Sequence, residues 1–483
     1  MRYLDLAIIV AYLGGITWFG AQFRHTQKGL KDYFLGGRSA PWWAIALSIV
    51  SAETSTLTII GTPTLAFGGN LAFLQVVLGY LLARLVISTL FLPHYFRGEM
   101  YTAYELMQVR FGPRIRRLTA ATFLAVRALA EGVRVFAISI VISIVLGTGE
   151  IASIVLIVCL TLFYTFEGGM TAVIWTDVIQ MLLYVCGAVV SFFVILHQIP
   201  GGWSHIAAVA APLGKLRIFD FGFEWTPAFF SRPYSFWAGV IGGCFLTTAS
   251  HGTEQLMVQR LLAARSERES RAALFASWAV IFVQFALFLL IGTMLFVLYR
   301  DRGMTPPNPP DRLYPGFVWN YLPTGIAGLI AAAILAAAMS NLSAALNSLA
   351  STTIIDFYRP MRGGEAGPRD LKLARAATIA WGAVLLAIGT VARHWGPVLE
   401  AGLTIASIAY GGLLGVFLLG LLPRRIPENA AIIGMVAGVA SVIYVKFATN
   451  IAFTWYVAIG TLMTIFVALA AAAFEKEPAR AGR

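Results

Sequence analysis

The segment PWWAIALSIVSAETSTLTIIGTPTLAF, residues 41–67, is long enough to cross a bilayer, yet Glu53 and several hydroxyl side chains lie at its centre. An α-helix needs roughly 20 apolar residues to span the hydrocarbon core. Polar residues at that depth are costly and usually line a pathway. Serine and threonine favour a local break in such a helix, and a break frees backbone carbonyl groups. The segment therefore predicts a broken membrane helix at a polar site.

The composition of the whole chain is that of a membrane protein. Of its 483 residues, 59% are hydrophobic and only 12% are charged, whereas soluble domains contain about 25% charged residues. The net charge of +12 does not indicate nucleic-acid binding, because lysine and arginine lie almost entirely in short loops between apolar segments. The three cysteines lie within apolar stretches, so we expect neither a disulfide nor a metal site.

Thirteen apolar segments qualify as membrane spans. They are 4–23, 41–67, 72–93, 118–146, 151–166, 172–197, 234–256, 273–299, 323–357, 371–392, 397–421, 428–447 and 452–473. No remaining stretch is large enough for a separate soluble domain. We therefore expect an all-α integral membrane protein, with residues 1–483 forming a single transmembrane domain.

The loops indicate how the chain is oriented. Most arginines and lysines lie in alternate loops, at 24–38, 97–117, 260–271, 359–372 and 424–425. Loops rich in these residues are cytoplasmic. An odd number of spans then places the N-terminus outside and the C-terminus in the cytoplasm. We expect a multi-pass protein of the plasma (inner) membrane, with the lipid bilayer as its partner.

Two further spans carry polar residues at membrane depth. Ser340, Ser343 and Asn347 lie on one face of the ninth span; they indicate either ion ligands or polar contacts between helices. In the fourth span, Glu131 lies between Arg127 and Arg134 at helical spacing. These charges either form a structural ion network or leave one arginine free to hold a substrate carboxylate.

Several motifs give the chain a family resemblance. They are YFLGGR at 33–38, FEGGMTAVIWTDVIQ at 166–180, EQLMVQR at 254–260, AMSNLS at 338–343 and IDFY at 355–358. In this order they resemble the sodium:solute symporter family, which includes sodium/glucose, sodium/proline and sodium/sialic acid cotransporters. The resemblance covers nearly the whole chain.

The resemblance implies a leucine-transporter-type fold with two inverted five-helix repeats, residues 41–197 and 234–421. The first helix of each repeat would be broken, the second of them near 247–252. Residues 1–40 would then form an extra N-terminal helix and a cytoplasmic loop, and residues 428–473 two extra C-terminal helices.

The resemblance also implies a sodium site. By position, the ligands would be backbone carbonyls of Ser51, Thr54 and Ala337 together with the side chains of Ser340 and Asn341. Asn341 stands where the family has serine or threonine, and an amide oxygen can still ligate sodium.

Some members bind a second sodium ion. Here Asp177 and Ser343 match that second site, whereas Ala344 lacks the usual hydroxyl. The alternative for Asp177 is a cap at the start of its helix.

A solute site is expected at mid-membrane, where the two broken helices cross. Its candidate residues are Glu53, Thr56 and Thr58 from the first broken helix, Thr247 and His251 from the second, and Arg134 from the fourth span. An unpaired carboxylate at the depth of Glu53 costs several kcal/mol unless a cation, a proton or a substrate group offsets it. An ionised Glu53 would favour an amine or a hydroxyl-rich solute. An Arg134 left free by Glu131 would favour a carboxylate.

The expected function is secondary active transport. Inward movement of sodium, the coupling ion, would drive uptake of a small organic solute such as a sugar, an amino acid or a carboxylate by alternating access. The alternative is a membrane sensor with a transporter-like fold, which the short tail after residue 474 disfavours. No enzyme motif or metal spacing is present among the six histidines, and no cofactor is expected.

Overall fold

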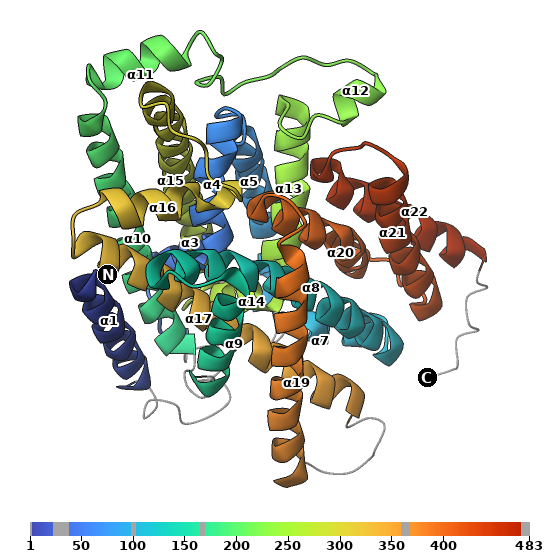
Figure 1. The fold of residues 1–483 in the computed structure, drawn as a ribbon. Helices are drawn as coiled ribbons and strands as arrows, with labels where there is room; N and C mark the ends of the chain where they lie inside the picture. Colours follow the sequence, from blue (N-terminus) through green and yellow to red (C-terminus); the bar gives the residue numbers. More distant parts are fainter. Residues whose placement is uncertain (1, 23–37, 98–102, 165–169, 359–367, 475–483) are drawn as a thin grey trace.

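The computed structural model describes residues 2–22, 38–97, 103–164, 170–358 and 368–474 (Figure 1). The motif residues 33–37 and 166–169 lie outside the described residues. Nine helices of the described part are long and apolar enough to cross a membrane, and one bent pair makes a tenth. The nine are α5 with α6 (Leu74–Phe96), α8 (Pro113–Leu146), α10 (Met170–Gln198), α15 (Glu267–Asp301), α17 (Ile326–Thr352), α19 (Pro368–Ala392), α20 (Val398–Leu421), α21 (Glu428–Ala448) and α22 (Tyr456–Phe474).

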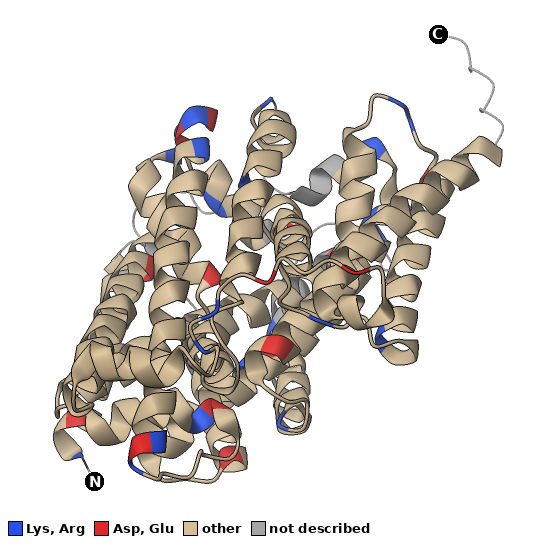
Figure 2. Cartoon of the chain, turned by 90° about the horizontal axis from the view of Figure 1, so that it is seen from above, with Lys and Arg blue, Asp and Glu red and all other residues tan. Residues whose placement is uncertain are grey.

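An all-α, multi-pass membrane protein is thereby confirmed, but thirteen spans are not. The helices α1 (Tyr3–Ala21) and α9 (Glu150–Tyr164) are apolar but shorter in their described part. Helix α13 (Phe236–Thr253) has 18 residues, and the polar residues of its second half lower its hydropathy. Charged residues are few, and most of them lie at helix ends or in connecting segments (Figure 2).

The first predicted break is confirmed. Helices α3 (Trp42–Glu53) and α4 (Thr56–Gly68) meet at an angle of 63°. Between them, Thr54 and Ser55 leave the helical conformation, and the Thr54 N–H bonds back to the Val50 carbonyl. Within the described chain, the carbonyl oxygens of Ser51 and Thr54 accept no hydrogen bond, so the break supplies the free carbonyls that the sequence predicted.

The second break lies at Glu254, just beyond the region near 247–252 where it was predicted. Helix α13 continues through Thr253, Glu254 is extended with φ −84° and ψ 127°, and α14 (Gln255–Leu262) follows. The hydroxyls of Ser250 and Thr253 donate to carbonyls of their own helix. Because these side chains are satisfied within α13, they do not interrupt it.

Glycines allow two helices of the interior to make a close contact. Helix α13 crosses α5 where a Cβ on Gly243 would lie 2.1 Å from the Val76 carbonyl oxygen, and one on Gly79 would lie 2.3 Å from that of Val240. Only glycine allows this approach. The crossing places the end of α13 beside α3 and α5.

The chain order around the two breaks is similar. Residues 41–197 begin with the broken helix α3–α4 and continue with α5–α6, α8, α9 and α10. Residues 234–421 begin with α13–α14 and continue with α15, α17, α19 and α20. This is the helix order expected for two five-helix repeats. Short helices occupy the connecting segments, α11 (Gly202–Ala210) and α12 (Pro227–Phe230) at one end of the molecule (Figure 1) and α16 (Leu313–Tyr321) between η4 (Pro310–Arg312) and α17.

Candidate functional site

The carboxylate of Glu53, the last residue of α3, is paired. Its Oε2 lies 2.9 Å from Nη2 of Arg84 and 3.3 Å from Nε2 of His251. Arg84 is completely buried, and its other nitrogens donate to the carbonyls of Tyr80 and Leu274. Of the three ways to offset the Glu53 charge that the sequence left open, a cation, a proton or a substrate group, the structure shows a cation of the protein itself.

This cluster joins the two broken helices. Glu53 closes the first half of one, His251 lies on α13 of the other, and Arg84 comes from α5. Arg84 was not among the predicted residues, although an arginine inside the apolar span 72–93 is itself a signal for an acidic partner. The separation of 31 residues between Glu53 and Arg84 hid the pairing.

A second ion cluster surrounds the second break. Arg127 of α8 lies 2.9 Å from both Glu131 and Glu254, measured from guanidinium nitrogen to carboxylate oxygen. Tyr410 of α20 donates to the other oxygen of Glu254 at 2.7 Å. Arg134 donates to Glu131. The predicted ion network is confirmed, and the hypothesis that Glu131 leaves Arg134 free is wrong.

The guanidinium groups of this cluster keep some unused donors. The Nε atoms of Arg127 and Arg134 are buried and have no acceptor among the described residues. Such an atom costs free energy until a ligand or a water accepts from it. The cluster is therefore held together by its own charges and still offers donors to an anion.

The α17 residues that were predicted to bind sodium are unusual for a membrane helix. Ser348 and Thr353 donate to carbonyls of the preceding turn, as hydroxyls in membrane helices commonly do. The side chains of Ser340, Asn341 and Ser343 have no hydrogen-bond partner in the part of the chain that the structure describes. Their oxygen atoms are therefore available to a ligand. Ala337 is buried one turn earlier on the same helix.

On the side of the first broken helix, Ser51 and Thr54 are both buried. Gln284 of α15 donates from Nε2 to Thr54 Oγ1 at 2.7 Å. The hydroxyl of Tyr184 on α10 lies beside Ser51 and Thr54. Neither Gln284 nor Tyr184 was among the predicted residues, although an amide inside the apolar span 273–299 is a signal that points to Gln284. The helix α17 meets this broken helix through α4 and packs against α8 and α10.

Asp177 is held in an ion pair of its own. Its Oδ2 lies 3.0 Å from Nη2 of Arg260 on α14 and accepts from Ser48 Oγ of α3 at 2.7 Å. Helix α10 begins at Met170, so Asp177 lies two turns inside it and is not a cap. The contacts given by the structure do not bring Asp177 to Ser343.

The remaining predicted solute residues are buried around the two clusters. Thr58 Oγ1 lies 3.4 Å from the carbonyl oxygen of Glu53. The hydroxyls of Thr56 and Thr247 are without a partner within the described ranges. The structure thus brings Glu53 and His251 together, whereas Arg134 belongs to the other cluster.

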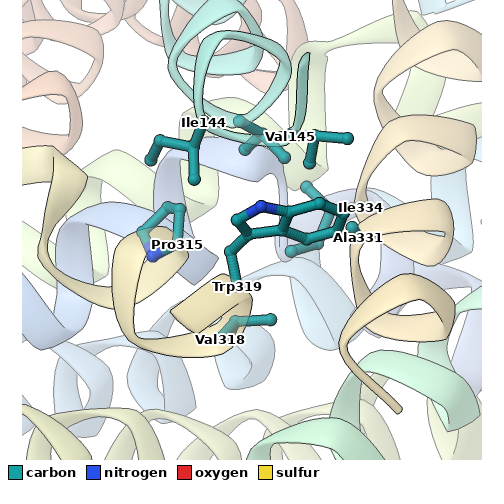
Figure 3. Close-up of a pocket in the computed structure, with 8 residues that line it drawn as sticks. Ile144, Val145, Pro315, Val318, Trp319, Ala331 and Ile334 are labelled. Atoms are coloured by element: carbon teal, nitrogen blue, oxygen red, sulfur yellow. The ribbon is translucent and has the colours of Figure 1, made fainter. Parts of the chain in front are cut away.

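An apolar contact closes the space between α8, α16 and α17 at one end of the bundle. Trp319 lies between Pro315 and the α17 side chains Ala331 and Ile334 (Figure 3). The gap left there is about 10 Å³, which is no more than a single water needs. A solute therefore has no room at this contact.

Comparison with known proteins identifies the family. The model of the sodium:solute symporter family matches residues 33–438. The sodium/sialic acid symporter NanT of Aliivibrio fischeri is 28% identical, over 96% of this chain and 92% of that protein. The human sodium/iodide cotransporter is 27% identical over 93% of this chain and 70% of its own length. The sodium-coupled monocarboxylate transporter 1 of Xenopus laevis is 27% identical over 93% of this chain and 72% of its own length.

Solved structures agree with these relatives. A substrate-bound, outward-open sodium-coupled sialic acid symporter is 27% identical, covers 98% of both chains and has a TM-score of 0.82. A transporter of the nucleobase–cation symport family, 13% identical with a TM-score of 0.57, shares the fold. The fold is the leucine-transporter type. Since a family model covers most of its length, the chain belongs to the sodium:solute symporter family and is a sodium-coupled solute transporter, not an enzyme.

Proposed function

We propose that sodium moving inward drives uptake of a small organic anion through this protein by alternating access. The charge balance of the two clusters carries this proposal. Glu53 is offset by Arg84, and the pair Glu131 and Glu254 is offset by two arginines. One bound sodium ion then leaves one uncompensated positive charge, which is costly in a buried site. A monovalent anion bound beside the sodium ion removes that cost.

The names of the relatives support the same class of solute. Sialic acid, iodide and monocarboxylates are all monovalent anions at neutral pH. Sequence identity of 27–28% does not carry over a particular solute. A carboxylate is the class that the buried Nε donors of Arg127 and Arg134 would bind.

The proposed sodium ligands are the carbonyls of Ser51, Thr54 and Ala337 and the side chains of Ser340 and Asn341. Their support is the pair of carbonyls at the first break and the unpaired oxygens on α17. Oxygen ligands of this kind suit a small hard cation.

A second sodium ion at Asp177 and Ser343 would require Asp177 to leave Arg260 and Ser48. We therefore assign the coupling to the first site.

The solute is proposed to bind between the two breaks. Thr56, Thr58 and Thr247 would supply hydroxyl groups, and Arg134 a donor to the anionic group. Glu53 would contribute to the site as the partner of Arg84 in a salt bridge, not as a free carboxylate, and His251 lies beside that salt bridge.

The membrane topology completes the proposal. The protein would lie in the plasma (inner) membrane with its N-terminus outside and its C-terminus in the cytoplasm, as the arginine-rich loops indicate. Residues 41–197 and 234–421 would be inverted repeats whose first helices supply the two breaks.

Uptake into proteoliposomes with an inward sodium gradient tests the proposed solute class. Labelled monocarboxylates, sialic acids, sugars and neutral amino acids would be compared for the wild type, Glu53→Gln, Arg134→Ala and Arg134→Lys. We expect sodium-dependent uptake of an anion that Arg134→Ala abolishes and that Arg134→Lys retains in part. Sodium-driven uptake of neutral solutes alone would contradict the proposal.

A further inference from the structure

We propose that Gln284 is a positioning residue of the sodium site, which acts by fixing Thr54 at the first break. This inference rests on the proposed sodium ligands and adds a residue that neither the motifs nor the family resemblance points to. Gln284 lies 230 positions from Thr54 and on a different helix, α15.

Thr54 needs an external support, because no helix fixes it completely. It lies between α3 and α4, where its φ of −88° and ψ of 75° are outside the helical region. Its N–H is held by the Val50 carbonyl, and its own carbonyl oxygen is free for a ligand. A small rotation of this residue would turn that oxygen away from the ion, so the hydroxyl bond to Gln284 limits the rotation.

Gln284 is itself firmly placed. It is 2% exposed, and it lies near the middle of α15, the 35-residue helix that packs along both α3 and α4. A Cβ on Gly292 of the same helix would lie 2.1 Å from the carbonyl oxygen of Pro63 on α4, so the two backbones are in direct contact. A site whose ligand is braced from a rigid neighbouring helix keeps its geometry better than one on a free segment.

The amide also has an unusual cost. Its Nε2 donates to Thr54 at 2.7 Å, but its Oε1 is buried and has no donor in the described part of the chain. A leucine or methionine would fill the same apolar helix face without leaving a polar atom unpaired. The presence of the amide is therefore explained by what its N–H does for Thr54. The competing explanation is that the bond between Gln284 and Thr54 only holds α15 against α3.

A double-mutant cycle on sodium affinity separates these two explanations. The variants are Gln284→Met, Thr54→Val and the double variant, assayed as sodium-dependent uptake and as sodium-dependent thermal stabilisation of the purified protein. We expect each single change to raise the half-saturating sodium concentration five- to tenfold and to alter the sodium-to-lithium preference, with a smaller effect on maximal rate. The double variant should be no worse than the worse single variant, because both remove the same contact.

Thr293→Val is the matched control. It removes a buried hydroxyl without a partner in the described structure, nine residues further along α15, and should leave sodium affinity unchanged. Gln284→Asn provides a second variant if Gln284→Met does not fold, since its amide is one methylene too short to reach Thr54.

Three results would overturn the inference. A lower melting temperature for Gln284→Met with unchanged sodium affinity would mean that the bond only stabilises the packing of the helices. Additive effects in the cycle would mean that Gln284 does not act through Thr54. If the Gln284 variants keep their sodium affinity while Ser340→Ala loses affinity, the role of Gln284 is rejected and the proposed sodium site stands. If Ser340→Ala also keeps its sodium affinity, the proposed sodium site itself is rejected.

Discussion

At the scale of single residues, Ser340 offers the most direct test of the sodium site. Its hydroxyl has no partner among the described residues, whereas that of Ser348, two turns later on α17, donates to Ala344 at 2.8 Å. Ser340→Ala should raise the half-saturating sodium concentration about tenfold, equivalent to roughly 1.4 kcal/mol, with little change in melting temperature. Ser348→Ala is the control and should leave sodium affinity as it is. Equal sodium affinity in both variants would remove Ser340 from the site.

The pair of Glu53 and Arg84 predicts a different outcome, a loss of stability. Arg84→Met leaves the carboxylate of Glu53 buried without its cation, which should lower the free energy of unfolding by about 3–5 kcal/mol. Combining Arg84→Met with Glu53→Gln removes both charges and should restore most of it. Thermal unfolding in detergent measures the effect. A double variant as unstable as Arg84→Met alone would show that the pair is not coupled.

At the scale of helices, the glycine crossing of α5 and α13 sets the position of His251. Gly243→Ala should push the two helices apart, because the new Cβ would meet the Val76 carbonyl oxygen at 2.1 Å. We expect a loss of about 1–3 kcal/mol and weaker solute uptake. Gly14→Ala on α1, where a Cβ meets nothing within 4 Å, is the control and should be neutral or slightly stabilising. Normal uptake by a stable Gly243→Ala protein would contradict this account.

The contact between η4 and α20 predicts a pH dependence. Asp311 accepts from the N–H of Val398, the first residue of α20, at 3.1 Å. Burial raises the pKa of Asp311 from 3.8 to about 6; the bond from Val398 opposes this rise and Glu400 adds to it. The folded protein therefore binds the proton more tightly than the unfolded chain, so this contribution to stability is present below about pH 4 and is lost as the pH rises through 6.

Melting temperature measured between pH 4.5 and 7 tests the role of Asp311. The wild type should lose up to roughly 3 kcal/mol of stability from this group over its titration, and Asp311→Asn should flatten that part of the profile. An unchanged slope in Asp311→Asn would assign the pH dependence to other groups.

The elements also show what the sequence could predict. The first break was predictable because Glu53 and several hydroxyl residues lie together at the centre of an otherwise apolar span. The second break lies just beyond its predicted place because Ser250 and Thr253 bond within α13, a local choice that residue types alone do not reveal. The clusters were predictable only in part. Arg127, Glu131 and Arg134 pair along one helix at fixed spacing, whereas the pairing of Glu53 with Arg84 and of Thr54 with Gln284 depends on how separate helices pack.

At the scale of the whole molecule, charge balance predicts how transport responds to voltage. If one sodium ion accompanies one monovalent anion, the loaded protein carries no net charge across the membrane, since the buried clusters balance internally. Moving one net charge through 100 mV changes the free energy by about 2.3 kcal/mol, which is roughly a 50-fold change in accumulation. An electroneutral cycle should change by less than about twofold.

The experiment clamps the potential of proteoliposomes with a potassium gradient and valinomycin while the sodium gradient is held constant. We expect the steady-state accumulation of the anion to be the same at 0 and −100 mV, and parallel sodium and solute fluxes to give a ratio of one to one. Accumulation that rises about 50-fold with the inside negative would require a second sodium ion, and Asp177 would have to release Arg260 to bind it. The same increase in Asp177→Asn would place the second ion elsewhere, because the carboxylate that could hold it there would be absent.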